Sequence, residues 1–116
     1  MDIYHIWCGL KPDVRDHEFV DAFSSYMELL EREGVIAGWR LTRKKLGLAP
    51  AHLGEFHIMI EVQDLTQLDT AFNWVASRAE PVEGEHYGLN SLVENVSFAL
   101  YRDFPDPVRE YGEERF

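Results

Sequence analysis

Two histidines have the type and spacing to do chemistry in this 116-residue chain. His5 lies in the apolar stretch 2–9, and His57 lies in the alternating stretch 55–63. Each histidine falls opposite to the purely apolar positions of its stretch, so both are expected on the same face of a sheet. Neighbouring imidazoles can form a general base with an orienting partner, bind a ligand or, with Glu61, hold a metal. They can equally be interface residues that are hydrogen-bonded across a dimer.

Positive charge is concentrated in one short segment, where Arg40, Arg43, Lys44 and Lys45 supply four of the 11 basic residues. One interpretation is an anion clamp, because the guanidinium fork fits carboxylate or phosphate groups. The other is an edge strand, where basic side chains discourage strand-to-strand aggregation. Arg40, which directly follows Trp39, is the best placed of the four to contact a ligand.

Composition limits the function classes. The chain has 21 acidic residues and a formal net charge of −10, which disfavours contact with nucleic acid and with anionic membrane surfaces. With Cys8 alone, neither an intramolecular disulfide nor a cysteine-cluster metal site is possible, and we expect a small buried side chain there. No stretch is typical of a signal peptide or a membrane span, so we expect a soluble cytoplasmic protein. We assign no metal ligand and no cofactor.

Periodicity predicts strand, helix, strand, strand, helix and strand in that order. The expected ranges are 2–9, 16–33, 35–46, 55–63, 64–79 and 94–101. Residues 82–92 are expected to add a short helical piece, and His52, His86 and Tyr87 to lie in loops. We interpret residues 1–102 as one domain, and residues 103–116, with two closely spaced prolines and many charges, as an arm over a surface or a neighbouring subunit.

Helix ends are marked by local signals. Asp13 or Asp16 can cap the first helix, and Gly34 is suited to the left-handed position after it. Asp64 and Gln67 have the spacing of a capping box at the second helix. Both helices carry apolar side chains along one stripe, so each packs by one side.

Two helices can cover only one face of a four-stranded sheet. The face away from them, called the open face below, would carry Ile3, His5, Trp7, His57, Met59, Ser97, Ala99 and Tyr101. Phe98 is expected in the core on the other face. The alternation leaves the register of 35–46 undecided, with Trp39 on one face and Arg40 on the other. So much apolar surface on the open face exceeds what a monomer usually exposes, which predicts a homodimer packed sheet against sheet.

The stretches IYHIWCGLK, GWRLTRKKLGL, VQDLTQLDTAF and ALYRDFPDP are similar to those of a small family of uncharacterised bacterial proteins. Through these residues and the element order, the chain resembles the dimeric α+β barrel proteins. This ferredoxin-like superfamily includes small monooxygenase-type, stress-responsive and muconolactone-isomerase-like domains. The resemblance implies an α+β, ferredoxin-like βαββαβ fold with an antiparallel sheet of order 4-1-3-2, helices on one face, and dimerisation. No catalytic motif of a characterised member matches this chain.

In that order the first and third strands are neighbours, and we expect them to be parallel. The predicted site is a pocket on the open face, which binds a small apolar or amphipathic ligand such as a fatty-acyl or aromatic acid. Its residues would be His5, Trp7, Trp39, Arg40, His57, Met59 and Tyr101. The alternatives are a cofactor-free monooxygenase or isomerase with a histidine base, and a structural dimer without a cavity. Whether the protein is an enzyme stays open at this point.

Overall fold

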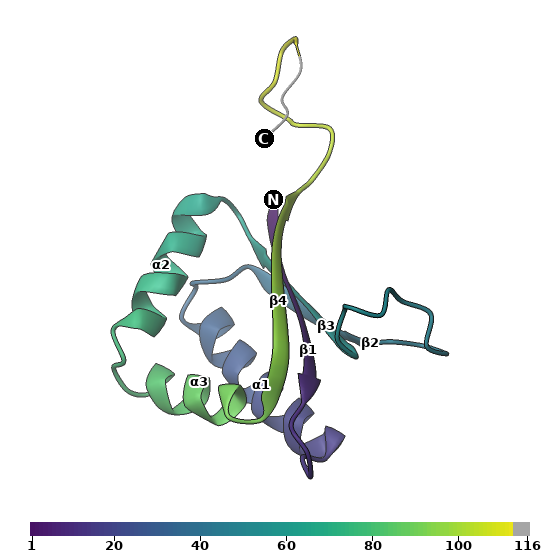
Figure 1. Ribbon diagram of the computed structural model, residues 1–116. Helices are drawn as coiled ribbons and strands as arrows, with labels where there is room; N and C mark the ends of the chain where they lie inside the picture. Colours follow the sequence, from purple (N-terminus) through teal and green to yellow (C-terminus); the bar gives the residue numbers. More distant parts are fainter. Residues whose placement is uncertain (113–116) are drawn as a thin grey trace.

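Three helices cover one face of a four-stranded sheet (Figure 1). The computed structural model describes residues 1–112. Its elements are β1 (Asp2–Leu10), α1 (Asp16–Arg32), β2 (Gly38–Arg43), β3 (Phe56–Val62), α2 (Leu65–Ala76), α3 (Val82–Asn90) and β4 (Val93–Arg102). The strand order is β2-β3-β1-β4, so the predicted element order and the 4-1-3-2 sheet are confirmed. The short helical piece predicted over 82–92 is α3, so His86 and Tyr87 are helical and the loop assignment for them is wrong.

The expectation of parallel first and third strands is wrong. β1 and β3 are antiparallel, with Trp7 opposite His57 and Tyr4 opposite Ile60. The reason is topological: β1 crosses over through α1 to a parallel β2, and β3 then returns between them in the opposite direction. All neighbouring strands are therefore antiparallel.

α1 packs through the predicted stripe, and Phe19, Phe23 and Met27 are buried. Neither Asp13 nor Asp16 caps the helix; the N-cap is Arg15, without a side-chain hydrogen bond. Asp16 is already the first residue of the helix, and its carboxylate accepts a hydrogen bond from Arg43. At the other end Gly34 has φ of +75°, as predicted for a left-handed residue after a helix.

α2 begins at the predicted cap. Asp64 accepts a hydrogen bond from the Gln67 backbone N–H at 2.9 Å. The side-chain oxygen of Gln67 accepts one from the Gln63 backbone N–H at 2.7 Å, not from Asp64 as in the usual capping box. These bonds fix the direction in which the chain leaves β3, and so where α2 lies beside the sheet.

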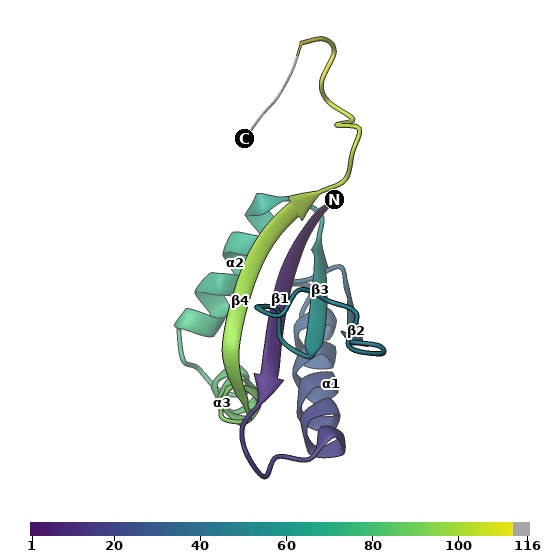
Figure 2. The ribbon, with the colours of Figure 1, turned by 45° about the vertical axis from the view of Figure 1, so that its right-hand side comes forward.

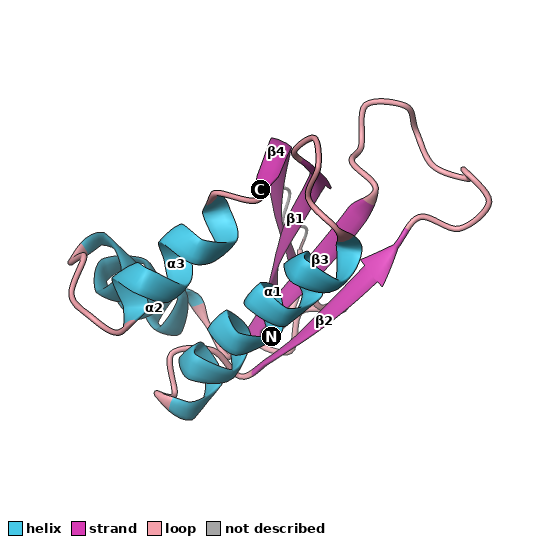
Figure 3. Cartoon of the chain, turned by 90° about the horizontal axis from the view of Figure 1, so that it is seen from below, coloured by secondary structure: helices cyan, strands magenta, loops and turns pink. Residues whose placement is uncertain are grey.

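The core lies between the helices and the sheet, where Phe56, Ile58, Ile60 and Val62 of β3 face the helices as predicted. Phe98 does not belong to this core: it faces the same side, but 60% of it is exposed. The reason is that α1 lies across β2 and β3, while α2 and α3 leave the outer edge at β4 uncovered (Figures 2 and 3). Among the described residues, no helix is both long and apolar enough to cross a membrane.

Phe23→Ala tests the core. Phe23 is fully buried, and the substitution is expected to lower the free energy of unfolding by about 3–5 kcal/mol through lost burial and a residual cavity. Tyr87→Ala is the control, because Tyr87 is 70% exposed on α3 and should cost less than about 1 kcal/mol. Urea titration at one protein concentration measures both. Equal losses in the two variants would contradict this core.

Candidate functional site

A cluster of rings occupies the centre of the open face. Nδ1 of His5 and Nε2 of His57 are 2.8 Å apart in a hydrogen bond. The Trp7 ring stacks on His57 with centroids 4.5 Å apart and planes at 7°. Tyr101 meets His5 edge-on at 4.9 Å and 69°. We call His5, Trp7, His57 and Tyr101 the imidazole cluster.

Sheet register places these rings together. His5 lies opposite Met59 on β3 and opposite Ala99 on β4, while Trp7 lies opposite His57. The two histidines are thus diagonal neighbours on one face, which confirms that they contact each other. Side chains alternate between the two faces along each strand, and the apolar residues that face the helices fix how β1 and β3 are aligned. The two histidines are therefore placed together on the opposite face.

Arg40 and Trp39 divide between the two faces. Arg40 lies opposite Met59 and is exposed on the open face. Trp39 lies opposite Ile60, and its ring meets Phe23 of α1 edge-on at 5.3 Å. The expectation that Trp39 lines an open-face pocket is therefore wrong, because adjacent strand residues point to opposite faces. The ligand-binding role of the other six residues stays a prediction.

Protonation of the imidazole cluster is disfavoured. Partial burial lowers the pKa of His5, and burial followed by repulsion from His5 lowers the pKa of His57. The hydrogen bond needs one ring nitrogen to donate and the other to accept, so two imidazolium rings cannot keep it. Within the part of the chain that the structure describes, no three His, Cys, Asp or Glu side chains gather to hold a metal ion.

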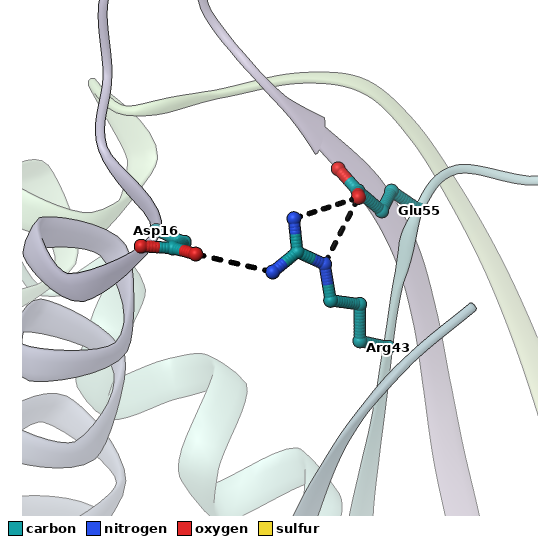
Figure 4. Close-up of polar contacts among 3 residues, drawn as sticks. All are labelled: Asp16, Arg43 and Glu55. Atoms are coloured by element: carbon teal, nitrogen blue, oxygen red, sulfur yellow. Dashed lines mark hydrogen bonds and ion pairs between the residues drawn. The ribbon is translucent and has the colours of Figure 1, made fainter. Parts of the chain in front are cut away.

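Arg43 is not available for a ligand. Its guanidinium contacts Glu55 Oε1 at 2.9 Å and Asp16 Oδ2 at 3.1 Å (Figure 4). Glu55, more than Asp16, raises the pKa of Arg43, and the hydrogen bond from Arg43 lowers the pKa of Asp16. These contacts join the ends of β2 and β3 to the beginning of α1.

An apolar cavity lies on the other face of the sheet, between β1, β3, β4 and the helices. Its volume is about 330 Å³, and none of the seven predicted site residues lines it. Its wall is almost entirely apolar. The lining residues are Tyr4, Ile6, Cys8, Phe23, Tyr26, Met27, Leu30, Ile36, Ile58, Ile60, Leu68, Ala71, Phe72, Val75, Ala76, His86, Leu89, Asn90, Val93, Val96 and Phe98.

Only a few polar groups reach this helix-side cavity. His86 of α3 lies edge-on to Tyr26 of α1, with ring centroids 5.9 Å apart, and Asn90 follows one turn later. Burial raises the pKa of Tyr26 to about 12 and that of Cys8 to about 11, so both keep their protons near neutral pH. Cys8 is 1% exposed, which confirms the buried side chain predicted from the sequence. The cavity lining thus includes hydrogen-bonding groups but no carboxylate, ammonium or guanidinium group.

Aromatic side chains border the cavity between α2 and β4. Tyr4 stacks on Phe98 at 5.8 Å and meets Phe72 edge-on at 5.4 Å. Phe72 and Phe98 are 48% and 60% exposed, so they present apolar surface to the solvent. Sequence reasoning missed this site because Phe98 was assigned to the core and His86 to a loop. The sequence feature that could have indicated the site is the row of apolar residues on the helix-facing side of β4, Val96, Phe98 and Leu100, which the helices leave exposed.

Comparison with known families gives the relationship of the chain. A model of a family of unknown function, DUF6614, matches residues 1–116. The chain belongs to this family. No curated protein matches it.

Solved structures share the fold at low sequence identity. At3g17210 from Arabidopsis thaliana has a TM-score of 0.72 at 9% identity, over 93% of this chain and 100% of that one. SnoaB, a cofactor-independent oxygenase from Streptomyces nogalater, has a TM-score of 0.68 at 10% identity, over 93% of this chain and 97% of that one. A dimeric ferredoxin-like protein of unknown function from Jannaschia has a TM-score of 0.60 at 11% identity, over 89% of this chain and 100% of that one. These likenesses confirm the ferredoxin-like fold.

Acid is expected to destabilise the protein through the imidazole cluster. Near pH 7.5 and above, both histidines are almost entirely neutral in the folded and the unfolded chain. As pH falls from there through the lowered folded pKa values, the unfolded chain binds protons first, so the free energy of unfolding decreases. His57→Phe keeps a ring beside Trp7 and removes one titrating group. The variant's free energy of unfolding should therefore decrease less than that of the parent between about pH 7.5 and pH 5.5.

The control is His52→Phe, at an exposed loop position, which should keep the parent pH dependence. Urea titrations at fixed protein concentration measure all three proteins. If His57→Phe loses as much stability on acidification as the parent, the cluster does not carry the effect. Asp16 titrates in a lower pH range, since its pKa is lowered from that of an ordinary carboxyl.

Proposed function

We propose that this protein is a homodimer that binds a small apolar or amphipathic molecule in the helix-side cavity. One observation carries the proposal: an apolar cavity of about 330 Å³ bordered by the partly exposed Phe72 and Phe98. That volume falls within the range of ligand pockets, and a mostly apolar wall with a few polar groups is typical of them. The sequence-based proposal of a ligand is kept, and its place moves to the other face of the sheet.

The polar groups of the cavity indicate the ligand's chemistry. His86, Asn90 and the neutral phenol of Tyr26 can hydrogen-bond a hydroxyl, a carbonyl or a phenol. A carboxylate would meet no lysine or arginine there, because Arg40 lies on the opposite face and the Arg43 guanidinium contacts Asp16 and Glu55. We therefore favour a largely apolar, aromatic or acyl ligand with one neutral polar end over a free acid.

The homodimer is supported by the open face and by fold neighbours. Ile3, Trp7, Met59 and Ala99 lie there without a covering helix. Two copies of such a face bury each other in an isologous contact. Neighbours from Bacteroides fragilis and Jannaschia, at 17% and 11% identity, are described as dimeric. In this arrangement the imidazole cluster lies at the interface, and the helix-side cavity stays on the outer side of each sheet.

A second candidate is a cofactor-independent oxygenase. It is supported by the likeness to SnoaB, together with His86 beside Tyr26 in an apolar cavity. An imidazole there could take the proton of a phenolic substrate, which then supplies the electrons that reduce oxygen. Oxygen consumption with a polycyclic hydroquinone, lost in His86→Phe and kept in His52→Phe, would favour this candidate over binding alone.

The cavity is tested by filling it. Ala71 is 6% exposed on α2 and lines the cavity. Ala71→Leu should therefore weaken binding of the neutral fluorescent probe N-phenyl-1-naphthylamine about 5- to 150-fold, through overlap costing about 1–3 kcal/mol. Thr70→Leu is the matched control, because Thr70 is the exposed neighbour on the same helix. Fluorescence titration measures the Kd of each variant.

If Ala71→Leu and the parent bind the probe with equal affinity, the assignment of the ligand site to the helix-side cavity is contradicted. Nuclear Overhauser contacts of the bound probe then decide its place: contacts to Ile58 support the helix-side cavity, and contacts to Met59 support the open face that the sequence predicted.

The dimer is tested on the open face. Sedimentation equilibrium should give twice the chain mass of 13.5 kDa at micromolar concentration. Ala99→Glu places an unpaired carboxylate opposite His5 in each copy and should raise the dimer Kd about 100-fold or more, since burying such a charge costs about 3 kcal/mol or more. Thr70→Glu adds the same charge on α2 and should leave the dimer intact. A parent protein that sediments as a monomer contradicts the proposal.

A further inference from the structure

Two segments project from the sheet, each with exposed apolar side chains. The C-terminal arm, residues 103–112 of the described chain, extends beyond the sheet, with Phe104, Val108 and Tyr111 78–88% exposed (Figures 1 and 2). The 44–55 loop between β2 and β3 lies on the side of the sheet away from the helices, with Leu46 and Leu48 more than 80% exposed. Neither segment buries these side chains within its own chain.

The arm has local structure. Arg102 contacts the Asp106 carboxylate at 2.7 Å, and Arg109 contacts it at 3.8 Å, so that the Asp106 side chain is only 5% exposed. The guanidinium of Arg109 lies over the Phe104 ring at 5.9 Å. An arm shaped by such contacts loses less conformational entropy on docking than a random coil does.

The 44–55 loop borders a hollow of about 240 Å³ on the open face. The lining residues are Trp7, Thr42, Arg43, Lys44, Lys45, Leu48, Ala49, Leu53, Gly54, Glu55 and His57. The base of the loop is fixed by the ion pairs of Arg43 (Figure 4) and by Gly54, where a Cβ would lie 2.5 Å from the Cys8 backbone. Two members of the predicted site, Trp7 and His57, thus border a real hollow.

Charge complements shape. Residues 103–116 contain five acidic and two basic residues, a formal charge of −3. Within the described part of the arm, Asp103 is paired with the N-terminal ammonium and Asp106 with Arg102 and Arg109, so Glu110 carries the negative charge that is open to a partner. The hollow has the opposite sign, because Glu55, its acidic member, is paired with Arg43, while Lys44 and Lys45 add two positive charges. An acidic segment with apolar side chains therefore matches a basic hollow with apolar walls.

The arm begins at the corner of the sheet opposite to the hollow of its own chain and extends away from the sheet (Figure 1). The arm leaves the end of β4 at one edge of the sheet, next to the beginning of β1. The 44–55 loop follows β2 at the other edge and at the opposite end of the strands. The arm and the 44–55 loop thus lie at diagonally opposite corners of the sheet. When two open faces pack together about a two-fold axis that is perpendicular to the line joining these two corners, each arm meets the partner's loop. The strands of the two sheets then cross, as in orthogonal sheet packing.

From these observations we infer that the C-terminal arm of one protomer docks into the basic hollow beside the 44–55 loop of its partner. This inference rests on the proposed homodimer. The two-fold symmetry gives two such contacts in each dimer, and each covers Trp7 and His57 from the solvent. The exposed residues Phe104, Val108 and Tyr111 supply the apolar contact, and Glu110 of the arm faces Lys44 and Lys45.

Disulfide cross-linking in the full chain tests the docking. Val108→Cys and Leu48→Cys chains of different tag mass are mixed and oxidised with copper phenanthroline. The native Cys8 is buried and does not compete. A cross-link between the two chains is expected. Thr70→Cys, on the outer side of α2, is the negative control, and Val96→Cys reports an arm that covers the helix-side cavity instead.

The outcomes separate the docking from the dimer. A parent that sediments as a monomer overturns the dimer and the docking together. A dimer in which Val108→Cys links to Val96→Cys or Thr70→Cys, or to no position, overturns the docking alone. A cross-link confined to Leu48→Cys supports it.

Charge reversal gives an independent test. Lys45→Glu should raise the dimer Kd roughly 2- to 30-fold, because the altered site occurs twice in each dimer, and less so at high salt. Adding Glu110→Lys to the same chain should restore much of the affinity. Arg78→Glu makes the same change in net charge at an exposed position near the end of α2 and should leave the Kd unchanged. Equal effects of Lys45→Glu and Arg78→Glu would contradict the docking.

Discussion

The structure depends on the uneven covering of a sheet that has two faces. Period-two alternation gives each strand an apolar set for the helices, such as Ile58 and Ile60 of β3, and a second set on the open face. Three helices cover only the first face. The open face then carries rings and methyl groups, with a hydrogen-bonded histidine pair among them. A second copy of the same face is the simplest surface that matches it.

The helix-side cavity has the same origin on a smaller scale. α1 lies across β2 and β3, whereas α2 and α3 do not close over β4, so Phe98 and Leu100 remain half exposed. Where helices fail to meet the sheet closely, the apolar side chains line a space instead of filling it. The two faces of the sheet are thus suited to different roles. The open face is suited to association with a second copy of the chain, and the opposite face is suited to a small apolar ligand.

Charge is distributed in the same divided way. The chain is strongly acidic, yet the run from Arg40 to Lys45 lies at one edge of the sheet, and the acidic arm leaves from the other edge. Basic residues on an edge strand discourage pairing with arbitrary strands. In the proposed dimer the same residues face the partner's arm, so one local charge pattern would serve both solubility and specific assembly.

From the sequence alone, periodicity determined the element order, the helix-facing set of β3 and the shared face of His5 and His57, because each depends on local alternation. That the two histidines are neighbours followed from the sheet order that the resemblance implied. Register and helix placement were decided only in the tertiary structure. Trp39 belongs to the helix side because β2 aligns it with Ile60, and Phe98 is exposed because α2 and α3 stop short of β4. The helix-side cavity is likewise a product of three-dimensional packing. No pattern within one segment specifies how far two packed layers stand apart.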